Sequence, residues 1–343
     1  MKKVSIIGAG IGGIATAIRL AVKGYQVAVY EANDYPGGKL SSFKQAGYRF
    51  DAGPSLFTMP QFVDELFLLA NRKPTDYFEY IRTPEVCRYF WEDGTRFTTD
   101  ASPEKFGQDA EKILGEPAQN IVSYLQKSAF KYEVLSGLFL EDSLHKLSTW
   151  TSRKALKGYV NLPKMGIFGT LNHENEQAFV QPKTIQLFNR YATYNGSDPY
   201  QTPATMSIIP HLEYNVGAFM PKEGMFGITS SLVKLAEELV VKFHYNARVE
   251  EIVVNNGNTT GIKVNGTFVA SDIVVSNMDI TPTYRKLLPT QKHPEKLLNQ
   301  PKSGSGLIFY WGIKREFNEL GLHNIFFSDD YKTEFEHQFK HKT

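Results

Sequence analysis

The sequence predicts an α/β protein in which a domain built on a parallel β-sheet is interrupted by a second domain of mixed α and β structure. Three observations lead to this class. The chain opens with a strand, a helix and a strand within about thirty residues. A β-meander and one further strand follow much later, at residues 249–275, and the stretch between is mainly helical in pattern. With 343 residues, 42% of them hydrophobic and 22% charged, the chain can build two cores, which excludes intrinsic disorder.

The N-terminal pattern begins with an apolar run at residues 4–7 that stops at a glycine turn, as a buried strand does. Over residues 11–23 apolar side chains recur at helical spacing, and Gly24 stands where a left-handed residue ends a helix. Residues 27–30 predict a second strand, which ends at Glu31. Because a helix joins the two strands, they should be parallel.

Three further elements are expected before residue 100. A strand pair lies around Gly47, and residues 61–70 have a helical pattern. Residues 88–98 predict a β-hairpin, and the pair Asp93-Gly94 favours a primed turn between its strands.

The pattern is then mainly helical over residues 103–170, loop-rich over residues 171–200 and helical again over residues 228–241. Three strands joined by turns that contain Asn-Gly form a meander, at residues 249–254, 261–264 and 267–270. Residues 272–275 predict a strand that returns to the central sheet.

Composition excludes several classes of protein. The 38 basic and 36 acidic residues give a net charge of +2, so we expect no nucleic-acid partner. Cys87 is the single cysteine, which excludes an internal disulfide, and no metal site is expected. No apolar stretch reaches the roughly 18 residues that span a membrane, and glycines interrupt the apolar run near the N-terminus. We therefore expect a cytoplasmic protein, with attachment to a membrane surface still open.

A glycine motif carries the first functional signal. Residues 8–13 read Gly-Ala-Gly-Ile-Gly-Gly, follow a predicted strand and open a predicted helix. Gly8 permits the tight turn, Gly10 lets the backbone approach a pyrophosphate, and Gly13 lets the helix pack on the strand. Glu31 can accept hydrogen bonds from ribose hydroxyls. The motif predicts a Rossmann-type dinucleotide site rather than ordinary turn glycines, and leaves the choice between NAD and FAD open.

The segment that follows Glu31 reads Pro36-Gly37-Gly38-Lys39 and leaves no room for a standard crossover helix. Its glycines and its lysine can place backbone and a cation beside the same pyrophosphate. The alternative is a plain surface turn.

These features together resemble the flavin-dependent amine oxidase and phytoene desaturase superfamily. The glycine motif, Glu31, residues 36–39 and the run Phe50-Asp51-Ala52-Gly53-Pro54 stand in that family's order and spacing. Residues 50–60 are similar to the corresponding run of bacterial hydroxycarotenoid 3,4-desaturases, and they lack the Met-Gly-Pro-Ser-Trp type of sequence of relatives that act on phytoene. The turn at residues 221–225 and the meander also fit.

The resemblance implies that the dinucleotide is FAD. Its pyrophosphate would lie on the main chain of the glycine motif with Lys39 beside it, its ribose on Glu31, its flavin near Gly53, and its adenine against the backbone of Val249. The cofactor-binding residues that this implies are Gly8, Gly10, Ile11, Gly12, Gly13, Glu31, Ala32, Gly38, Lys39, Gly53, Pro54, Ser55 and Val249.

The resemblance also implies the activity and the domain roles. We expect an FAD-dependent carotenoid desaturase, most like a 1-hydroxycarotenoid 3,4-desaturase, that passes hydride from the polyene to the flavin with loss of a proton. A quinone or oxygen would reoxidise the flavin, and the enzyme would lie on the inner face of the cell membrane. We expect residues 1–100 to form the first part of the FAD-binding domain with the start of the substrate domain. Residues 101–220 would form a largely helical insertion that faces substrate or membrane. Residues 221–285 would complete the FAD-binding domain, and residues 286–343 would form the rest of the substrate domain.

Other interpretations remain. One is a phytoene-type desaturase or another flavin oxidoreductase of the superfamily, such as an amine oxidase. Another is a non-catalytic isoprenoid-binding chaperone of the GDP-dissociation-inhibitor type. An NAD-dependent dehydrogenase is disfavoured through the resemblance. The family's final glycine-rich FAD segment is not found before Thr343, so we expect a truncated chain.

Two sets of residues have open roles. His211, Glu213 and Tyr214 could accept the proton, although a structural role is favoured for each. A basic and apolar stretch predicts either a membrane-facing patch or a core helix followed by a loop. That stretch consists of Arg153, Lys154, Lys157 and Lys164 with Leu156, Tyr159, Val160, Leu162, Met165, Ile167 and Phe168.

Overall fold

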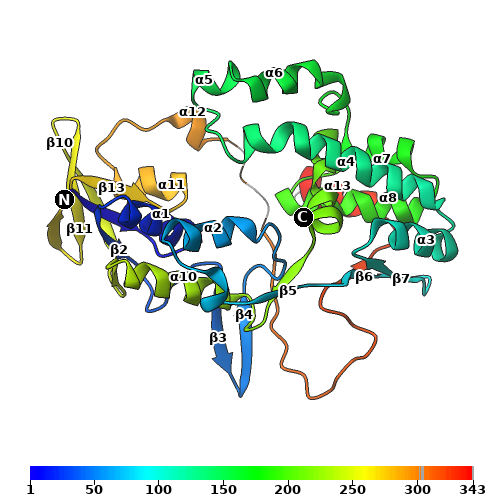
Figure 1. Cartoon of the computed structure of the whole chain (residues 1–343), viewed down its shortest axis with the longest axis horizontal. Helices are drawn as coiled ribbons and strands as arrows, with labels where there is room; N and C mark the ends of the chain where they lie inside the picture. The colour runs from blue at the N-terminus through cyan, green and yellow to red at the C-terminus, as the bar shows by residue number, and fades with distance from the viewer. Residues whose placement is uncertain (301, 303–304, 342–343) are drawn as a thin grey trace. The chain divides into compact units, whose positions relative to one another are not determined.

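The computed structural model describes residues 1–300, 302 and 305–341 (Figure 1). Contacts within the chain divide it into two compact units. The first comprises Met1–Ile81, Phe219–Pro301 and Tyr310–Gly312, and the second comprises Arg82–Ala218, Lys302–Phe309 and Ile313–Thr343. The domain boundaries expected from the sequence stay a prediction.

A parallel sheet forms the centre of the first unit, with the strand order β13-β1-β2-β9. Its strands are β1 (Lys3–Ile7), β2 (Gln26–Tyr30), β9 (Lys242–His244) and β13 (Ile273–Ser276). All neighbouring pairs are parallel, as predicted for the first two strands. Four of the five residues of β1 are buried, which is the pattern of a strand covered on both faces.

Helices α1 (Ile11–Val22) and α10 (Phe226–Glu238) pack against each other beside this sheet. Ile14, Ala17 and Ile18 of α1 are buried at helical spacing, in one core with Ile6 and Val29. Gly24 follows the helix with φ of 82°, so the predicted left-handed end is confirmed.

The rest of the first unit consists of small elements. The meander strands β10 (Val249–Asn255), β11 (Asn258–Val264) and β12 (Thr267–Ala270) form the predicted antiparallel sheet. Both residues of Asn256-Gly257 and of Asn265-Gly266 have positive φ, as a type I′ turn requires. The remaining elements are the hairpin β3 (Ser41–Gln45) and β4 (Tyr48–Ala52), α2 (Gln61–Leu69), η1 (Pro74–Asp76), β5 (Tyr80–Arg82), β8 (Phe219–Pro221), α11 (Ile280–Pro282), η6 (Thr283–Leu287) and α12 (Glu295–Leu298).

A small mixed sheet and a set of helices form the second unit. Strand β6 (Glu85–Trp91) pairs antiparallel with β7 (Arg96–Asp100) and parallel with β14 (Asn324–Phe327). Its core is strongly aromatic, with Tyr89, Phe97, Phe106, Phe188, Tyr191 and Tyr214 fully buried. The helices are α3 (Pro103–Leu114), α4 (Ala118–Phe139), α5 (Leu147–Trp150), α6 (Arg153–Val160), α7 (Leu171–Ala178), α8 (Pro182–Asn189), α9 (Ile209–His211) and α13 (Tyr331–Glu336), with short turns η2 (Leu162–Lys164), η3 (Arg190–Asn195), η4 (Ala204–Ile208), η5 (Leu212–Val216) and η7 (His337–His341).

The turn of the predicted β6–β7 hairpin differs from the expectation. The Trp91 N–H donates to the Thr95 carbonyl at 3.0 Å, so three residues rather than two connect the strands. Gly94 has φ of 85° while Asp93 is not among the residues with positive φ. The loop is therefore a turn followed by a left-handed glycine, and the prediction of a primed turn was wrong.

The predicted loop-rich link over residues 171–200 was also wrong, because it contains α7 and α8. The α7 sequence is polar and shows little helical periodicity, so its pattern resembles a loop. The helix is fixed instead by its ends and by burial: the Thr170 side chain accepts a hydrogen bond from the His173 N–H, and Leu171 and Asn175 are buried. The helix α8 begins with a proline in its first turn.

Candidate cofactor-binding site

The glycine turn between β1 and α1 is held in one conformation by its neighbours. Gly8 has φ of 94°, which favours glycine, and its N–H donates to the Tyr30 carbonyl at 2.8 Å. A methyl group built on Gly13 would lie 2.2 Å from the Gly8 carbonyl oxygen. The first turn of α1 therefore packs directly on the glycine turn, and the N–H groups at the start of the helix have no partner within it.

Glu31, at the end of β2, lies beside this turn. Its side chain is buried, with the residue 7% exposed. One carboxylate oxygen accepts from the Ala9 N–H at 2.8 Å, and the other accepts from the Asn33 N–H at 2.9 Å. A carboxylate has about four lone-pair positions, so two remain for further donors such as ribose hydroxyls. Ala32, which follows it, is exposed.

The segment after Glu31 runs alongside the glycine turn. The Gly37 N–H donates to the Ala9 carbonyl at 2.7 Å, and Gly37 forms a bridge with Gly10. A methyl group on Gly38 would lie 3.4 Å from the Gly10 Cα atom. The structure thus brings residues 36–39 to the motif of residues 8–13. Lys39 is exposed.

Gly53 connects the next motif to the same place. It has φ of 100°, and a methyl group built on it would lie 1.7 Å from the Lys39 carbonyl oxygen. Pro54 and Ser55 follow as exposed residues. The three motifs therefore lie in a row, with Gly10 against Gly37 and Lys39 against Gly53.

Asp51, in the same run, has a structural function that the sequence did not reveal. Its carboxylate accepts from the Met225 N–H at 2.9 Å and from the Phe226 N–H at 3.2 Å, at the start of α10. A methyl group on Gly224 would lie 2.4 Å from the same carboxylate. Asp51 thus caps a helix that lies far away in the sequence, and the runs at residues 50–54 and 221–225 are in direct contact.

Val249 lies at the start of β10 and is buried in one cluster with Ile7 and Tyr30. The Ala247 N–H donates to the Glu31 carbonyl at 2.8 Å, so the entry to β10 is fixed at the end of β2. The structure therefore brings Val249 to the same edge of the sheet as Glu31.

Asn277 belongs to this site but was missed by the sequence reasoning. It directly follows β13, and its N–H donates to the Ile7 carbonyl at 2.9 Å. Its side-chain amide lies over the glycine turn: methyl groups on Gly10 and Gly12 would lie 3.0 Å from its nitrogen and 2.8 Å from its oxygen. The available signal was its place after the predicted return strand, because ligands bind at the carboxyl ends of parallel strands.

The three candidates for a proton acceptor lie in the second unit. Glu213 is buried and accepts from Tyr191 Oη at 2.7 Å, from Arg190 at 3.3 Å and from the Tyr194 hydroxyl. The ring centroids of His211 and Tyr132 are 4.6 Å apart with the rings tilted, and burial lowers the pKa of the His211 imidazole. Within the described residues, the buried Tyr214 hydroxyl has no hydrogen-bond partner. The Glu213 oxygens are thus already bound to protein donors.

The first unit fits a dinucleotide. Gly10, Gly12 and Gly38 present backbone without side chains on the two sides of the turn, and a methyl group at Gly12 would displace the Asn277 amide. Glu31 supplies a buried acceptor at the end of the neighbouring strand. The parallel sheet, the glycine turn and this acid define a Rossmann-type dinucleotide-binding domain.

Comparison with known proteins identifies the family. The family described as flavin containing amine oxidoreductase matches residues 11–334. Over its full length the chain is 50% identical to the 1-hydroxycarotenoid 3,4-desaturase of Flavobacterium sp. (strain P99-3) and covers 70% of that protein. The chain belongs to the flavin-containing amine oxidoreductase family and, within it, to the carotenoid desaturases. The predicted resemblance and fold class are confirmed, and the dinucleotide is FAD rather than NAD.

Two more relatives support this placement. The 4,4'-diapolycopene oxygenase of Methylomonas sp is 31% identical over 99% of this chain, which covers 68% of that protein. The zeta-carotene-forming phytoene desaturase of Myxococcus xanthus is 30% identical over 99% of this chain, which covers 65% of that protein. The chain thus spans about two thirds of the length of these relatives.

Solved structures share the fold at low sequence identity. The PF1083 protein from Pyrococcus furiosus aligns with a TM-score of 0.57 at 14% identity, over 88% of this chain and 65% of that one. A triple mutant of putrescine oxidase aligns with a TM-score of 0.53 at 15% identity, over 83% of this chain and 59% of that one. Among the residues that the structure describes, no helix combines the length and apolarity needed to cross a bilayer.

Proposed function

We propose that the protein is an FAD-dependent carotenoid desaturase that introduces the 3,4 double bond of a 1-hydroxycarotenoid. The observation that carries this proposal is the 50% identity, over all 343 residues, to the enzyme of that name. The identity falls to 30% with the phytoene desaturase, which favours a hydroxylated polyene over phytoene. When bound, FAD supplies the two-electron oxidation, and the protein orients the substrate and excludes water.

The proposed FAD contacts start at the glycine turn. The main chain of Gly8, Gly10, Ile11, Gly12 and Gly13 would hold the pyrophosphate at the positive end of the α1 dipole. Support comes from the glycine backbone of the turn, over which the Asn277 side-chain amide lies close to Gly10 and Gly12, and from the helix N–H groups at the start of α1.

Other contacts would lie on both sides of that turn. Glu31, with the adjacent Ala32, would hold the adenosine ribose through its two free lone-pair positions. Gly38 and Lys39 would lie beside the phosphates, and Val249 would contact the adenine through its backbone. The row of contacts from Gly10 to Gly37 and from Lys39 to Gly53 supports this order.

Residues 53–55 would approach the flavin end of the cofactor. Gly53, Pro54 and Ser55 are exposed and follow Lys39 in the row of motifs. We extend the set by Asn277, whose exposed amide lies over Gly10 and Gly12. Its nitrogen would donate to the bound FAD at the glycine turn, because an amide NH₂ has two donors for phosphate oxygens.

A structural role is proposed for Glu213, because three protein donors already occupy its carboxylate. No residue is assigned as the proton acceptor. The proposed electron acceptor is a quinone or oxygen.

The proposed location is the cytoplasm, with peripheral attachment to the inner face of the cell membrane. Support comes from exposed apolar side chains in and after α6: Val160 is 73% exposed and Phe168 is 91% exposed. Met165 in the same stretch is buried, so only part of the predicted patch is exposed. Lys154 pairs with Glu141 and Asp142, and Lys157 pairs with Glu133, so neither has a free positive charge.

Product analysis in a host that makes 1-hydroxycarotenoids tests the activity. Each new conjugated double bond shifts the absorption of the polyene to longer wavelength, so we expect a red-shifted product that keeps its hydroxyl group. Consumption of phytoene with no change in the hydroxylated polyene would identify a phytoene-type desaturase. A protein that binds an isoprenoid chain but no FAD would instead favour the chaperone alternative.

A further inference from the structure

A cavity of about 790 Å³ lies in the second unit, between α4, α7 and the segment of residues 161–170. Helix α4 contributes Lys127, Phe130 and Lys131 to its wall.

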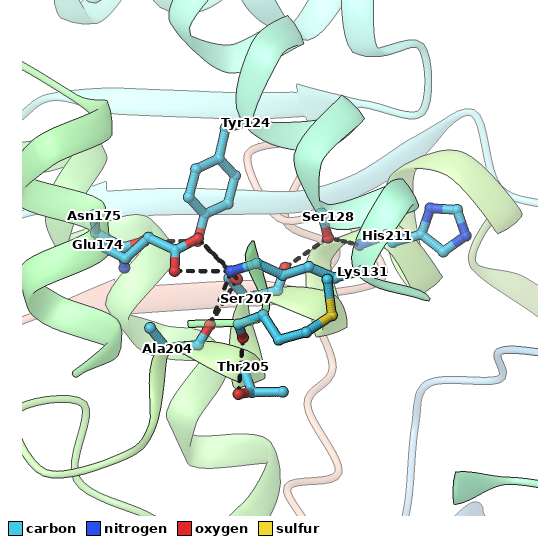
Figure 2. A network of polar contacts seen from close by, with 10 residues as sticks. Tyr124, Ser128, Lys131, Glu174, Asn175, Ala204, Thr205, Ser207 and His211 are labelled. Carbon is cyan, nitrogen blue, oxygen red and sulfur yellow. Dashed lines mark hydrogen bonds and ion pairs between the residues drawn. The ribbon is translucent and has the colours of Figure 1, made fainter. Parts of the chain in front are cut away.

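The floor of the cavity is a network of polar groups that are hydrogen-bonded to one another (Figure 2). The buried Lys131 Nζ donates to both Glu174 carboxylate oxygens, at 2.6 and 2.8 Å, and to Ser207 Oγ at 2.7 Å. It also donates to the Ala204 carbonyl at 3.3 Å. Glu174 is the one carboxylate among the lining residues, and Lys131 neutralises it. The floor thus has no net charge.

The rim of the cavity keeps uncompensated positive charge. Lys127 and Lys164 are exposed, and within the described part of the chain neither has a carboxylate at ion-pair distance. Lys164 lies with its Nζ 5.6 Å from the Phe130 ring centroid. Burial is the main cause that lowers the pKa of Lys131, and the charge of Lys127 lowers it further against the effect of Glu174. His173, also on the wall, shares a hydrogen bond with Gln177, and the buried Tyr124 hydroxyl donates to the Asn175 side chain at 2.6 Å.

The same rim is apolar toward solvent. Gly166 and Gly169 line the cavity, while Ile167 and Phe168 between them are exposed, Phe168 almost fully. Leu162, next to the lining residue Pro163, is exposed as well. An amphiphilic ligand has a charged part and an apolar part. The unpaired lysines can bind the charged part, and the large apolar side chains beside them can contact the apolar part.

We infer that this cavity binds the anionic headgroup of a membrane phospholipid, with Lys127 and Lys164 on the phosphate and Leu162, Ile167 and Phe168 in the acyl region. A soluble anion would match the lysines but would leave Phe168 in water, and an uncharged membrane surface would leave the two lysines without counter-charge. The inference deepens the proposed membrane attachment and identifies its lipid class.

Vesicle sedimentation of the whole chain tests it. Wild type should bind vesicles of phosphatidylglycerol and phosphatidylcholine much more tightly than vesicles of phosphatidylcholine alone. Each lysine near an anionic surface contributes about a fivefold change in affinity, so the variant K127Q/K164Q should bind the anionic vesicles about 25-fold more weakly. Its thermal unfolding midpoint should stay at the wild-type value, because both lysines are exposed.

The matched control is K44Q/K242Q, which removes the same net charge from two exposed lysines of the first unit. This control should bind like wild type. The variant F168S, which keeps both lysines, should also lose affinity for the anionic vesicles.

Equal losses in K127Q/K164Q and K44Q/K242Q would show that net charge alone acts, and would overturn the inference. So would full competition by free glycerol phosphate at the headgroup concentration of the vesicles, because the site would then be one for a soluble anion. Carotenoid products measured with the same variants report separately on the proposed function: absent desaturation with intact vesicle binding contradicts that function and leaves the lipid site standing.

Discussion

The carboxylate of Glu31, directly after β2, accepts a hydrogen bond at 2.8 Å from the N–H of Ala9, in the glycine turn that follows β1. An acid expected from the sequence to hold a ribose thus also fixes the loop on which the pyrophosphate would lie. Its second oxygen accepts from Asn33, so one side chain holds the ends of both strands.

The substitution Glu31→Gln should weaken both the packing of the glycine turn and the binding of the FAD ribose. An amide has one acceptor oxygen, so one of the two N–H groups loses its partner, at a cost of about 1–3 kcal/mol in the free energy of unfolding. Loss of a charged acceptor for the ribose should weaken FAD binding by roughly 10- to 100-fold. Chemical denaturation without FAD and flavin fluorescence titration measure the two effects separately. Unchanged FAD affinity would contradict the proposed ribose contact.

The substitution Asn277→Asp should lower FAD affinity more than Asn277→Ala does. Both variants remove the amide donor, and the aspartate adds a negative charge beside the phosphates. Because Asn277 is exposed, the stability of the FAD-free protein should change by less than about 0.5 kcal/mol. Asn255→Asp, at the exposed end of β10, is the control that should leave FAD affinity unchanged. Equal affinities for the alanine and aspartate variants would place Asn277 away from the phosphates.

The substitution Asp51→Asn should destabilise the first unit. One oxygen would remain for the N–H groups of Met225 and Phe226 at the start of α10, and the favourable charge at the helix end would be lost. We expect a loss of about 1–2 kcal/mol in the free energy of unfolding. Asp34→Asn, an exposed change in the loop after β2, is the control with an expected effect near zero. Equal unfolding midpoints for the two variants would argue against the cap.

A pair of alanine substitutions at helical glycines separates close packing from helix propensity. Gly13→Ala places a methyl group 2.2 Å from a backbone oxygen, and should cost about 1–3 kcal/mol and abolish FAD binding. Gly158→Ala in α6 meets no atom within 4 Å and should stabilise by up to about 1 kcal/mol. Urea denaturation measures both. A Gly13→Ala protein as stable as wild type would contradict the close approach of α1 to Gly8.

The stability of the protein should fall as the pH is lowered through about 6.5. Burial lowers the pKa of His211 and of His323 below their ordinary value of 6.5. The unfolded chain therefore binds more protons than the folded chain in this range, and unfolding is favoured as the pH falls. Thermal unfolding at pH 5.5 and 7.5 measures the loss, which should shrink in the variant His211→Gln. A midpoint independent of pH over this range would contradict it.

The parts of the fold that sequence could predict are those in which local chemistry decides. Gly8 in the glycine motif and the Asn-Gly pairs at two meander turns have positive φ, a conformation that few other residues adopt. Helix α7 was missed because capping by Thr170 and burial of Asn175 hold a polar sequence in place. The hairpin turn was misjudged because the pairing of Trp91 with Thr95 depends on the register of whole strands.

The candidate site also contains residues that the sequence could predict and residues that it could not. Motif residues such as Gly10 and Gly37 could be assigned from spacing, and the structure places them next to each other. Two other contacts join segments more than 170 residues apart in the sequence. Asp51 contacts Met225 at the start of α10, and Asn277 contacts Gly10 in the glycine turn. No pattern within either segment specifies such a contact.

The most direct measurement is a titration of the purified protein with FAD, followed by flavin fluorescence, for wild type and Glu31→Gln in parallel. Saturation at one FAD per chain, with a clearly weaker transition in the variant, is the result expected for a cofactor on the glycine turn with its ribose on Glu31. Absence of saturable binding by wild type, or identical curves for both proteins, would contradict it.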